Sequence, residues 1–142
     1  MVINTRAKME TATTHTILII DDNLDDVEIT KRTLARIDRE LTVETALRGE
    51  TALELLRLEQ ALPALILLDL KMPGMSGFDT LRKIRADERL KHIPVIIVTS
   101  SSLETDEKAG FDAGADAFLH KAFDIDRFSS DLKSLLKCHL KI

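Results

Sequence analysis

Short apolar runs alternate along the chain with longer segments in which apolar residues recur every three or four positions. Continuously apolar runs are typical of strands that are buried on both faces, as in parallel sheets. Five runs rich in Ile, Val and Leu therefore predict strands at Thr16–Ile20, Leu41–Ala46, Leu65–Leu68, Pro94–Val98 and Asp116–Leu119.

The segments that follow the strands have the periodicity of amphipathic helices, with apolar residues gathered on one face. These residues are Val27, Leu34 and Ile37 after the first strand, Phe78, Leu81 and Ile84 after the third, and Ile125, Phe128, Leu132, Leu135 and Leu136 after the last. A strand followed by a helix, five times over, predicts an α/β domain. Its parallel sheet is open, its crossovers are right-handed, and helices cover both faces.

Glycines and one proline mark the connections. Pro73, Gly74 and Gly77 favour a turn between the third strand and the third helix. We expect Gly114 to end the fourth helix, because glycine suits a left-handed stop. Gly110 lies inside that helix and should weaken it by about 1 kcal/mol relative to alanine.

The chain length of 142 residues fits one domain, which we expect to span residues 16–142. Residues 1–15 are polar and rich in threonine, and they predict a flexible leader rather than a signal peptide. With 44% hydrophobic and 31% charged residues, the composition excludes a disordered chain or a coiled coil. The longest apolar runs are too short to cross a membrane.

Charge and cysteine content narrow the partners and the compartment. A formal net charge of -4 leaves no basic excess for binding phosphates, which argues against a nucleic-acid partner. The single cysteine, Cys138, cannot form an internal disulfide. A reducing, cytoplasmic location is the simplest interpretation.

Chemically active residues follow four of the five predicted strands. Asp21 and Asp22 follow the first, Asp69 the third, Thr99 the fourth and Lys121 the last. Sites in such sheets form at the carboxyl ends of the strands, so we expect these side chains to converge on one edge.

Each of these residues alone has an ordinary structural explanation. Asp21, Asp22 or, better placed, Asp25 could cap the following helix, Thr99 could be one more strand residue, and Lys121 could be solvated. Together they indicate more, because carboxylates that share a pocket repel one another unless a cation lies among them. A fold that gathers them predicts a metal site.

Four segments resemble the receiver domains of bacterial two-component response regulators. They are ILIIDDN at 17–23, LILLDLKMPGMSG at 65–77, IPVIIVTS at 93–100 and GADAFLHK at 114–121. The similarity extends from about residue 16 to about residue 140. It implies the flavodoxin-like receiver fold, (βα)5, with strand order 2-1-3-4-5.

The resemblance also implies roles for individual residues. Asp69 would be the phosphoacceptor, and Asp21, Asp22, Asp69 and the backbone carbonyl of Lys71 would hold Mg²⁺. Lys121 would donate to a phosphoryl oxygen. The lysine side chain at position 71 would slow hydrolysis of the acyl phosphate, unless it simply points into solvent.

The resemblance further implies a switch made of Thr99 and Phe118. The Thr99 hydroxyl would move to the phosphoryl group, and the Phe118 ring would turn into the space it leaves. The signal would appear on the surface of the fourth helix, fifth strand and fifth helix. An equally weighted alternative is that Phe118 is only a core aromatic.

The segment after Lys121 departs from the family, because Ala122 stands where a proline normally follows the lysine. A cis bond before a non-proline residue costs roughly 2.5–4 kcal/mol, so we expect a trans Lys121–Ala122 bond. We also expect Lys121 still to point toward Asp69.

The function implied is that of a stand-alone response regulator, since only about a helix's worth of chain follows Lys121. Its partners would be a sensor histidine kinase or a histidine phosphotransfer protein and a downstream protein, with neither nucleic acid nor membrane involved. It would be no enzyme beyond a weak autophosphatase activity.

Three other classes fit the residues less well. A Mg²⁺-dependent phosphohydrolase with an aspartyl nucleophile needs an acid two residues later, where this chain has Lys71. A flavin-binding protein needs a phosphate loop after the first strand, where Asp21 and Asp22 would repel phosphate. A binding module with a dead site would not keep the acceptor, metal and cation positions intact.

Overall fold

The computed structural model describes residues 15–58, 61–101, 103–121 and 124–140, which contain a five-stranded parallel sheet. The strand order is β2-β1-β3-β4-β5, as predicted. Because residues 1–14 lie outside the described residues, the leader stays a prediction. The strands are β1 (Thr16–Ile20), β2 (Thr42–Ala46), β3 (Leu65–Leu68), β4 (Val95–Thr99) and β5 (Ala117–His120).

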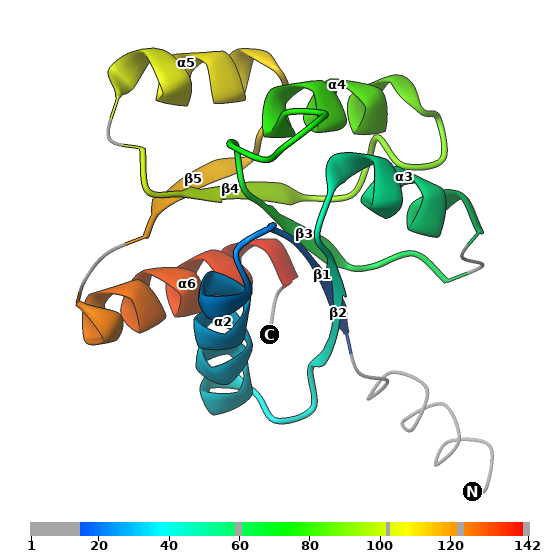
Figure 1. The fold of residues 1–142 in the computed structure, drawn as a ribbon. Coiled ribbons are helices and arrows are strands. Elements are labelled where there is room, and N and C mark those ends of the chain that lie inside the picture. Colours follow the sequence, from blue (N-terminus) through cyan, green and yellow to red (C-terminus); the bar gives the residue numbers. More distant parts are fainter. Residues whose placement is uncertain (1–14, 59–60, 102, 122–123, 141–142) are drawn as a thin grey trace, which may run out of the picture.

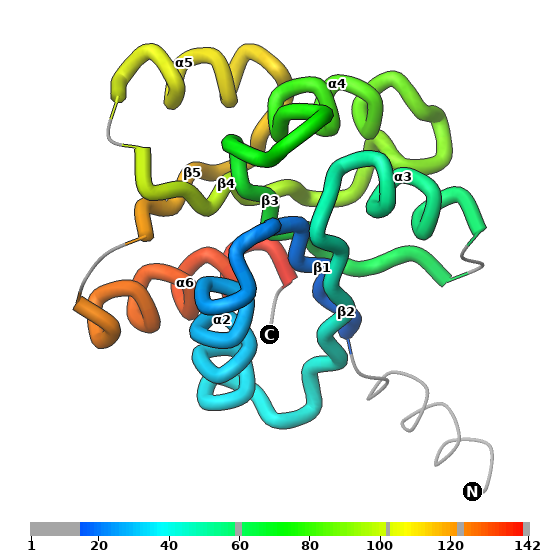
Figure 2. The backbone as a smooth tube through the Cα atoms, in the orientation of Figure 1, coloured from blue at the N-terminus to red at the C-terminus, as the bar shows by residue number. Residues whose placement is uncertain are grey.

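Helices cover both faces of the sheet, as Figure 1 shows: α2 and α6 lie on one face and α3, α4 and α5 on the other. They are α2 (Leu24–Ile37), α3 (Gly49–Leu58), α4 (Gly77–Ala86), α5 (Glu104–Asp112) and α6 (Ile125–Leu140). Figure 2 follows the chain through the repeated strand-then-helix pattern. Among the described helices, none is long and apolar enough to cross a membrane.

The sheet separates two apolar cores. Alternate residues of a strand point to opposite faces, so Ile19 packs with α2 and α6 while Ile20 packs with α3 and α4. All four residues of β3 and all five of β4 are buried. The continuous apolar runs in the sequence thus reflect burial from both sides.

Some strand ends differ by a residue from the predicted ones. β4 begins at Val95 and ends at Thr99, so Thr99 is its last residue rather than the residue after it. The pairing continues past β5, because the Lys121 N–H donates to the Thr99 carbonyl at 2.8 Å. This backbone bond fixes where the Lys121 side chain leaves the sheet.

None of Asp21, Asp22 and Asp25 is the N-cap of α2, the helix after β1. Asn23 is the N-cap of α2, and its side chain accepts the N–H of Asp26 at 3.1 Å. Asn is as good a cap as Asp. Asp25 therefore lies within the first turn, and the aspartates of the loop need not serve as caps.

The end of α5 confirms the role expected of Gly114. Its φ is 110°, its N–H donates to the Phe111 carbonyl, and the N–H of Ala115 donates to the Gly110 carbonyl. This is a Schellman ending.

Gly110 is buried, and a Cβ there would lie 2.6 Å from Cδ1 of Ile97. The residue that weakens the helix therefore also lets it approach the sheet.

We expect Gly77→Ala to destabilise the domain although alanine is the better helix former. A Cβ at Gly77 would lie 2.2 Å from the Asp69 carbonyl oxygen and 2.7 Å from Cα of Leu70, and backbone atoms cannot move aside cheaply. We expect a loss of about 2–3 kcal/mol in the free energy of unfolding, as for other overpacked sites. Urea unfolding followed by circular dichroism measures this loss, and an unchanged midpoint would contradict the packing.

Candidate functional site

The carboxylates of Asp21 and Asp69 meet because they follow neighbouring strands. Asp21 comes directly after β1 and Asp69 directly after β3, and the Asp69 N–H donates to the Ile20 carbonyl at 2.9 Å. Asp21 and Asp69 are buried, whereas Asp22 is exposed. One carboxylate oxygen from each of the three lies within 4.8 Å of the others. The predicted acidic cluster therefore exists.

Lys121 reaches the same place from the end of β5. Its Nζ lies 2.9 Å from Oδ2 of Asp21 and 3.6 Å from Oδ2 of Asp69. Only 17% of its side chain is exposed, so Lys121 is not the solvated surface lysine of the alternative interpretation. The structure thus places Lys121 toward Asp69, as expected.

Asp26 joins this group, although no pattern in the sequence singled it out. Its Oδ2 accepts a hydrogen bond from Nζ of Lys121 at 2.8 Å, the shortest of the three lysine–carboxylate distances. An acidic residue in the first turn of a helix is common because it suits the helix dipole. An aspartate at this position therefore does not by itself indicate a contact with Lys121, which lies 95 positions later in the chain.

Burial controls the ionisation of Asp69. It raises the pKa of this carboxyl from 3.8 to about 6, against the lowering effect of the Lys121 charge. The negative charge of Asp21 raises the pKa further, while the Leu70 N–H, which donates to Oδ1 at 2.9 Å, lowers it. The site therefore resists a further negative charge unless a cation accompanies it.

Lys121 keeps its charge in this setting. Burial lowers the pKa of its ammonium, but the hydrogen bonds to Asp26 and Asp21 outweigh that effect. The pKa of Lys121 consequently lies above its ordinary value. A permanent cation thus stands beside Asp69.

Thr99 is the last residue of β4, and Phe118 lies within β5. The Thr99 side chain is buried, and its hydroxyl oxygen accepts the N–H of Ser101 at 3.2 Å. Phe118 is half-buried and packs against the core, with ring centroids 6.3 Å from Phe111 and 5.4 Å from His120. Phe118 is therefore at least partly a core residue, and its role in a switch stays a prediction.

Two expectations about the loops remain open. Lys71 is exposed two residues after Asp69, and the part of its carbonyl in metal binding stays a prediction. The Lys121–Ala122 bond includes Ala122, which lies outside the described residues.

The donor set suits a hard divalent cation. Three carboxylates offer oxygen ligands from a small region, and two of them are buried. Oxygen is the ligand that magnesium and calcium ions prefer, and the raised pKa of Asp69 reflects a need for positive charge. Asp21, Asp22 and Asp69 could therefore hold a metal ion.

Comparison with known proteins finds one family over most of the chain, the response regulator receiver domain, at residues 17–133. A probable cyclic di-GMP phosphodiesterase of Vibrio cholerae is 37% identical over 133 residues, which are 94% of this chain and 28% of that protein. The chain thus spans little more than a quarter of that relative. The polar-differentiation response regulator DivK of Brucella ovis is 32% identical over 87% of this chain and 97% of DivK.

Solved structures agree with this assignment. The phosphorylated cyanobacterial phytochrome response regulator RcpA is 28% identical, with a TM-score of 0.82, over 89% of this chain and 94% of that one. The bacteriophytochrome response regulator AtBRR is 31% identical, with a TM-score of 0.72, over 86% of this chain and 92% of that one.

In the absence of divalent cations, we expect Asp69→Asn to be more stable than the wild type at pH 7.5. The pKa of Asp69 is about 6 when folded, against 3.8 as its ordinary value. Between these values the folded state binds more protons than the unfolded state, so the free energy of unfolding falls as the pH rises through that window. Above it, ionised Asp69 costs about 1–3 kcal/mol, which asparagine avoids.

Urea unfolding in EDTA at pH 4.5 and 7.5 tests this expectation. Circular dichroism is the suitable probe because the chain has no Trp or Tyr. Asp22→Asn, in the same cluster but exposed, should have a smaller effect. An Asp69→Asn protein less stable than the wild type at pH 7.5 would contradict the proposed balance of charges.

Proposed function

We propose, from the premise that the chain belongs to the response regulator receiver family, that Asp69 accepts a phosphoryl group in a Mg²⁺-dependent reaction. The observation that carries the proposal is the geometry around Asp69. This buried carboxylate directly follows β3, shares a small region with Asp21 and Asp22, and lies 3.6 Å from the Lys121 ammonium.

The donor would be a phosphohistidine on a sensor histidine kinase or a histidine phosphotransfer protein. A carboxylate oxygen of Asp69 attacks phosphorus in line, and a P–O bond forms as the P–N bond breaks. The leaving imidazole nitrogen keeps the bonding electrons and takes up a proton. Lys121 donates to a phosphoryl oxygen, so positioning and charge supply most of the catalysis.

Asp21, Asp22 and Asp69 would hold Mg²⁺, and the Lys71 carbonyl would complete the protein ligands. When bound, the ion offsets the repulsion between the Asp69 carboxylate and the incoming phosphate. The raised pKa of Asp69 supports this assignment, because burial and Asp21 both disfavour its charged form.

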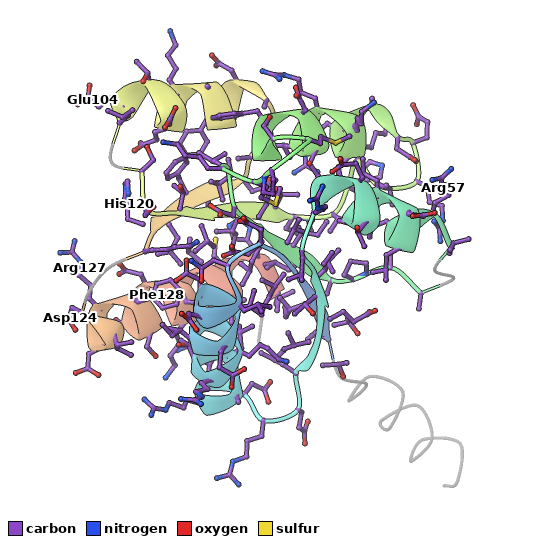
Figure 3. The ribbon with its side chains drawn as sticks, viewed as in Figure 1. Arg57, Glu104, His120, Asp124, Arg127 and Phe128 are labelled. Carbon is purple, nitrogen blue, oxygen red and sulfur yellow. The ribbon has the colours of Figure 1, made fainter. Side chains whose placement is uncertain are left out.

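The output would be a protein-interaction surface on α5, β5 and α6, controlled by Thr99 and Phe118. A pocket of about 520 Å³ opens between β5 and α6, and Phe118, His120 and Arg127 are among its lining residues. Figure 3 labels His120 and Arg127 at this end of the molecule. A change in the Phe118 ring would therefore alter a surface that a downstream protein can bind.

This function makes the chain a signalling phosphoacceptor rather than an enzyme, with at most a weak autophosphatase activity. The alternative of a Mg²⁺-dependent phosphohydrolase is disfavoured because an exposed lysine, Lys71, stands where the second acid would be. A cytoplasmic location and a stand-alone role, with no nucleic-acid or membrane partner, belong to the same proposal.

We expect Asp69→Asn to abolish phosphorylation, because the amide cannot attack phosphorus. The purified protein is incubated with acetyl phosphate and Mg²⁺, and the adduct is followed by intact-mass spectrometry. Wild type should gain one phosphoryl group that is labile in acid and in base, as an acyl phosphate is. Asp79→Asn, on an exposed helical position, serves as the control. Full phosphorylation of Asp69→Asn would refute the acceptor, and continuous turnover of free phosphodonor would favour the hydrolase.

We expect Lys71→Ala to shorten the lifetime of the phosphorylated state by about two- to fivefold. A long cationic side chain two residues after the acceptor would lie over the phosphoryl oxygens and hinder water, an effect of the size of a partly exposed ion pair. The half-life is measured after removal of the phosphodonor, with the exposed Lys83→Ala as control. Equal half-lives for wild type and Lys71→Ala would show that Lys71 simply points into solvent.

A further inference from the structure

The Lys121 ammonium is shared among carboxylates, and Asp69 is the most distant of them. Nζ lies 2.8 Å from Asp26, 2.9 Å from Asp21 and 3.6 Å from Asp69. The first two distances are hydrogen bonds, whereas the third is too long to be one. Lys121 is therefore engaged by Asp26 and Asp21 before any phosphoryl group arrives.

Asp26 and Asp21 differ in what else they do. Asp21 belongs to the carboxylate cluster that could hold a metal ion, and Asp26 does not. A cation in that cluster would draw Asp21 toward itself, which leaves Asp26 as the partner that competes for Lys121. The contact at Asp26 is thus the one that a phosphoryl group on Asp69 has to displace or share.

The position of Asp26 is fixed by its helix. Its N–H donates to the Asn23 side chain, and the next residue, Val27, is buried in the core beside α6. The side chains of Asp26 and Lys121 also line a cavity of about 60 Å³ together with the apolar residues Ile125 and Phe128. Figure 3 shows Phe128 on α6, next to α2. The Lys121 side chain is 17% exposed and that of Asp26 is 33% exposed, so the ion pair is only partly solvated and is stronger than a fully exposed one.

We propose that Asp26 is a positioning residue that holds the Lys121 ammonium back from Asp69, so that a phosphoryl group must compete with Asp26 for it. This inference rests on the proposed phosphoacceptor function. Asp26 thereby lowers the affinity of the site for a phosphoryl group. Removing its charge frees Lys121 for the phosphoryl oxygens.

The test measures an equilibrium rather than a reaction rate. Beryllofluoride binds to an aspartate in place of a phosphoryl group, and its affinity is measured by ¹⁹F NMR in the presence of Mg²⁺. We expect Asp26→Asn to bind beryllofluoride about three- to tenfold more tightly than the wild type, a size typical of one partly exposed charged hydrogen bond. Asp26→Ala, a second variant, should shift the affinity in the same direction.

Asp25→Asn is the matched control, because Asp25 precedes Asp26 in the same helical turn and is exposed. It removes the same charge from the helix start without removing the Lys121 contact. In a Lys121→Gln background, Asp26→Asn should no longer change the affinity. This loss of effect distinguishes positioning of Lys121 from a general structural or electrostatic role.

The outcomes separate this inference from the proposed function. Failure of the wild type to bind beryllofluoride, or undiminished binding by Asp69→Asn, would overturn the phosphoacceptor itself. Binding by the wild type with no gain in Asp26→Asn over Asp25→Asn would overturn only the role of Asp26. A gain that persists in the Lys121→Gln background would also overturn it.

Discussion

The crowding of like charges at the end of a buried sheet is the constraint on which the rest of the site depends. Asp21 and Asp69 come close because β1 and β3 are neighbours, and the apolar residues of these strands give the carboxylates little freedom to separate. Their repulsion requires compensation by positive charge. Lys121 supplies one such charge from β5, which is two strands away from β3, so only a long side chain can span the distance.

The surrounding backbone is built to keep Asp69 in place. Its N–H bonds to β1, its carboxylate accepts the Leu70 N–H, and the start of α4 packs against its carbonyl where Gly77 leaves no room for a side chain. The loop after β3 is therefore held from both the sheet and the helix. In the proposed reaction, a carboxylate with so few alternative positions would lose little freedom on reaching the transition state, which is how positioning contributes to rate.

The hydrophobic pattern of the sequence was sufficient to predict the strands, the parallel sheet and the edge at which the carboxylates meet. Continuous apolar runs allow this because they arise directly from burial on both faces of a strand. The exact strand order came from the family resemblance, since periodicity does not say which strands are neighbours.

Local details were harder to predict. Asn23 rather than an aspartate caps α2, and Asp26 contacts Lys121 across most of the chain length. A contact of that kind depends on how β5 and α2 are placed in the folded protein. A single acidic residue at the start of a helix does not predict that placement.

The way in which the site connects to the surface follows from the hydrogen bonds of Thr99. Its hydroxyl oxygen accepts the Ser101 N–H, and the Ser101 hydroxyl donates to Asp106 in the first turn of α5 at 2.6 Å. The side chain of Leu103, the N-cap of α5, makes no capping bond, whereas the Ser101–Asp106 bond attaches that helix start to the loop after β4. If the Thr99 hydroxyl turned toward a phosphoryl group, the Ser101 N–H would lose its partner, and the start of α5 would have to adjust. The proposed switch can therefore reach α5 through the loop after β4 as well as through Phe118, because Gly110 brings the middle of the same helix against that ring.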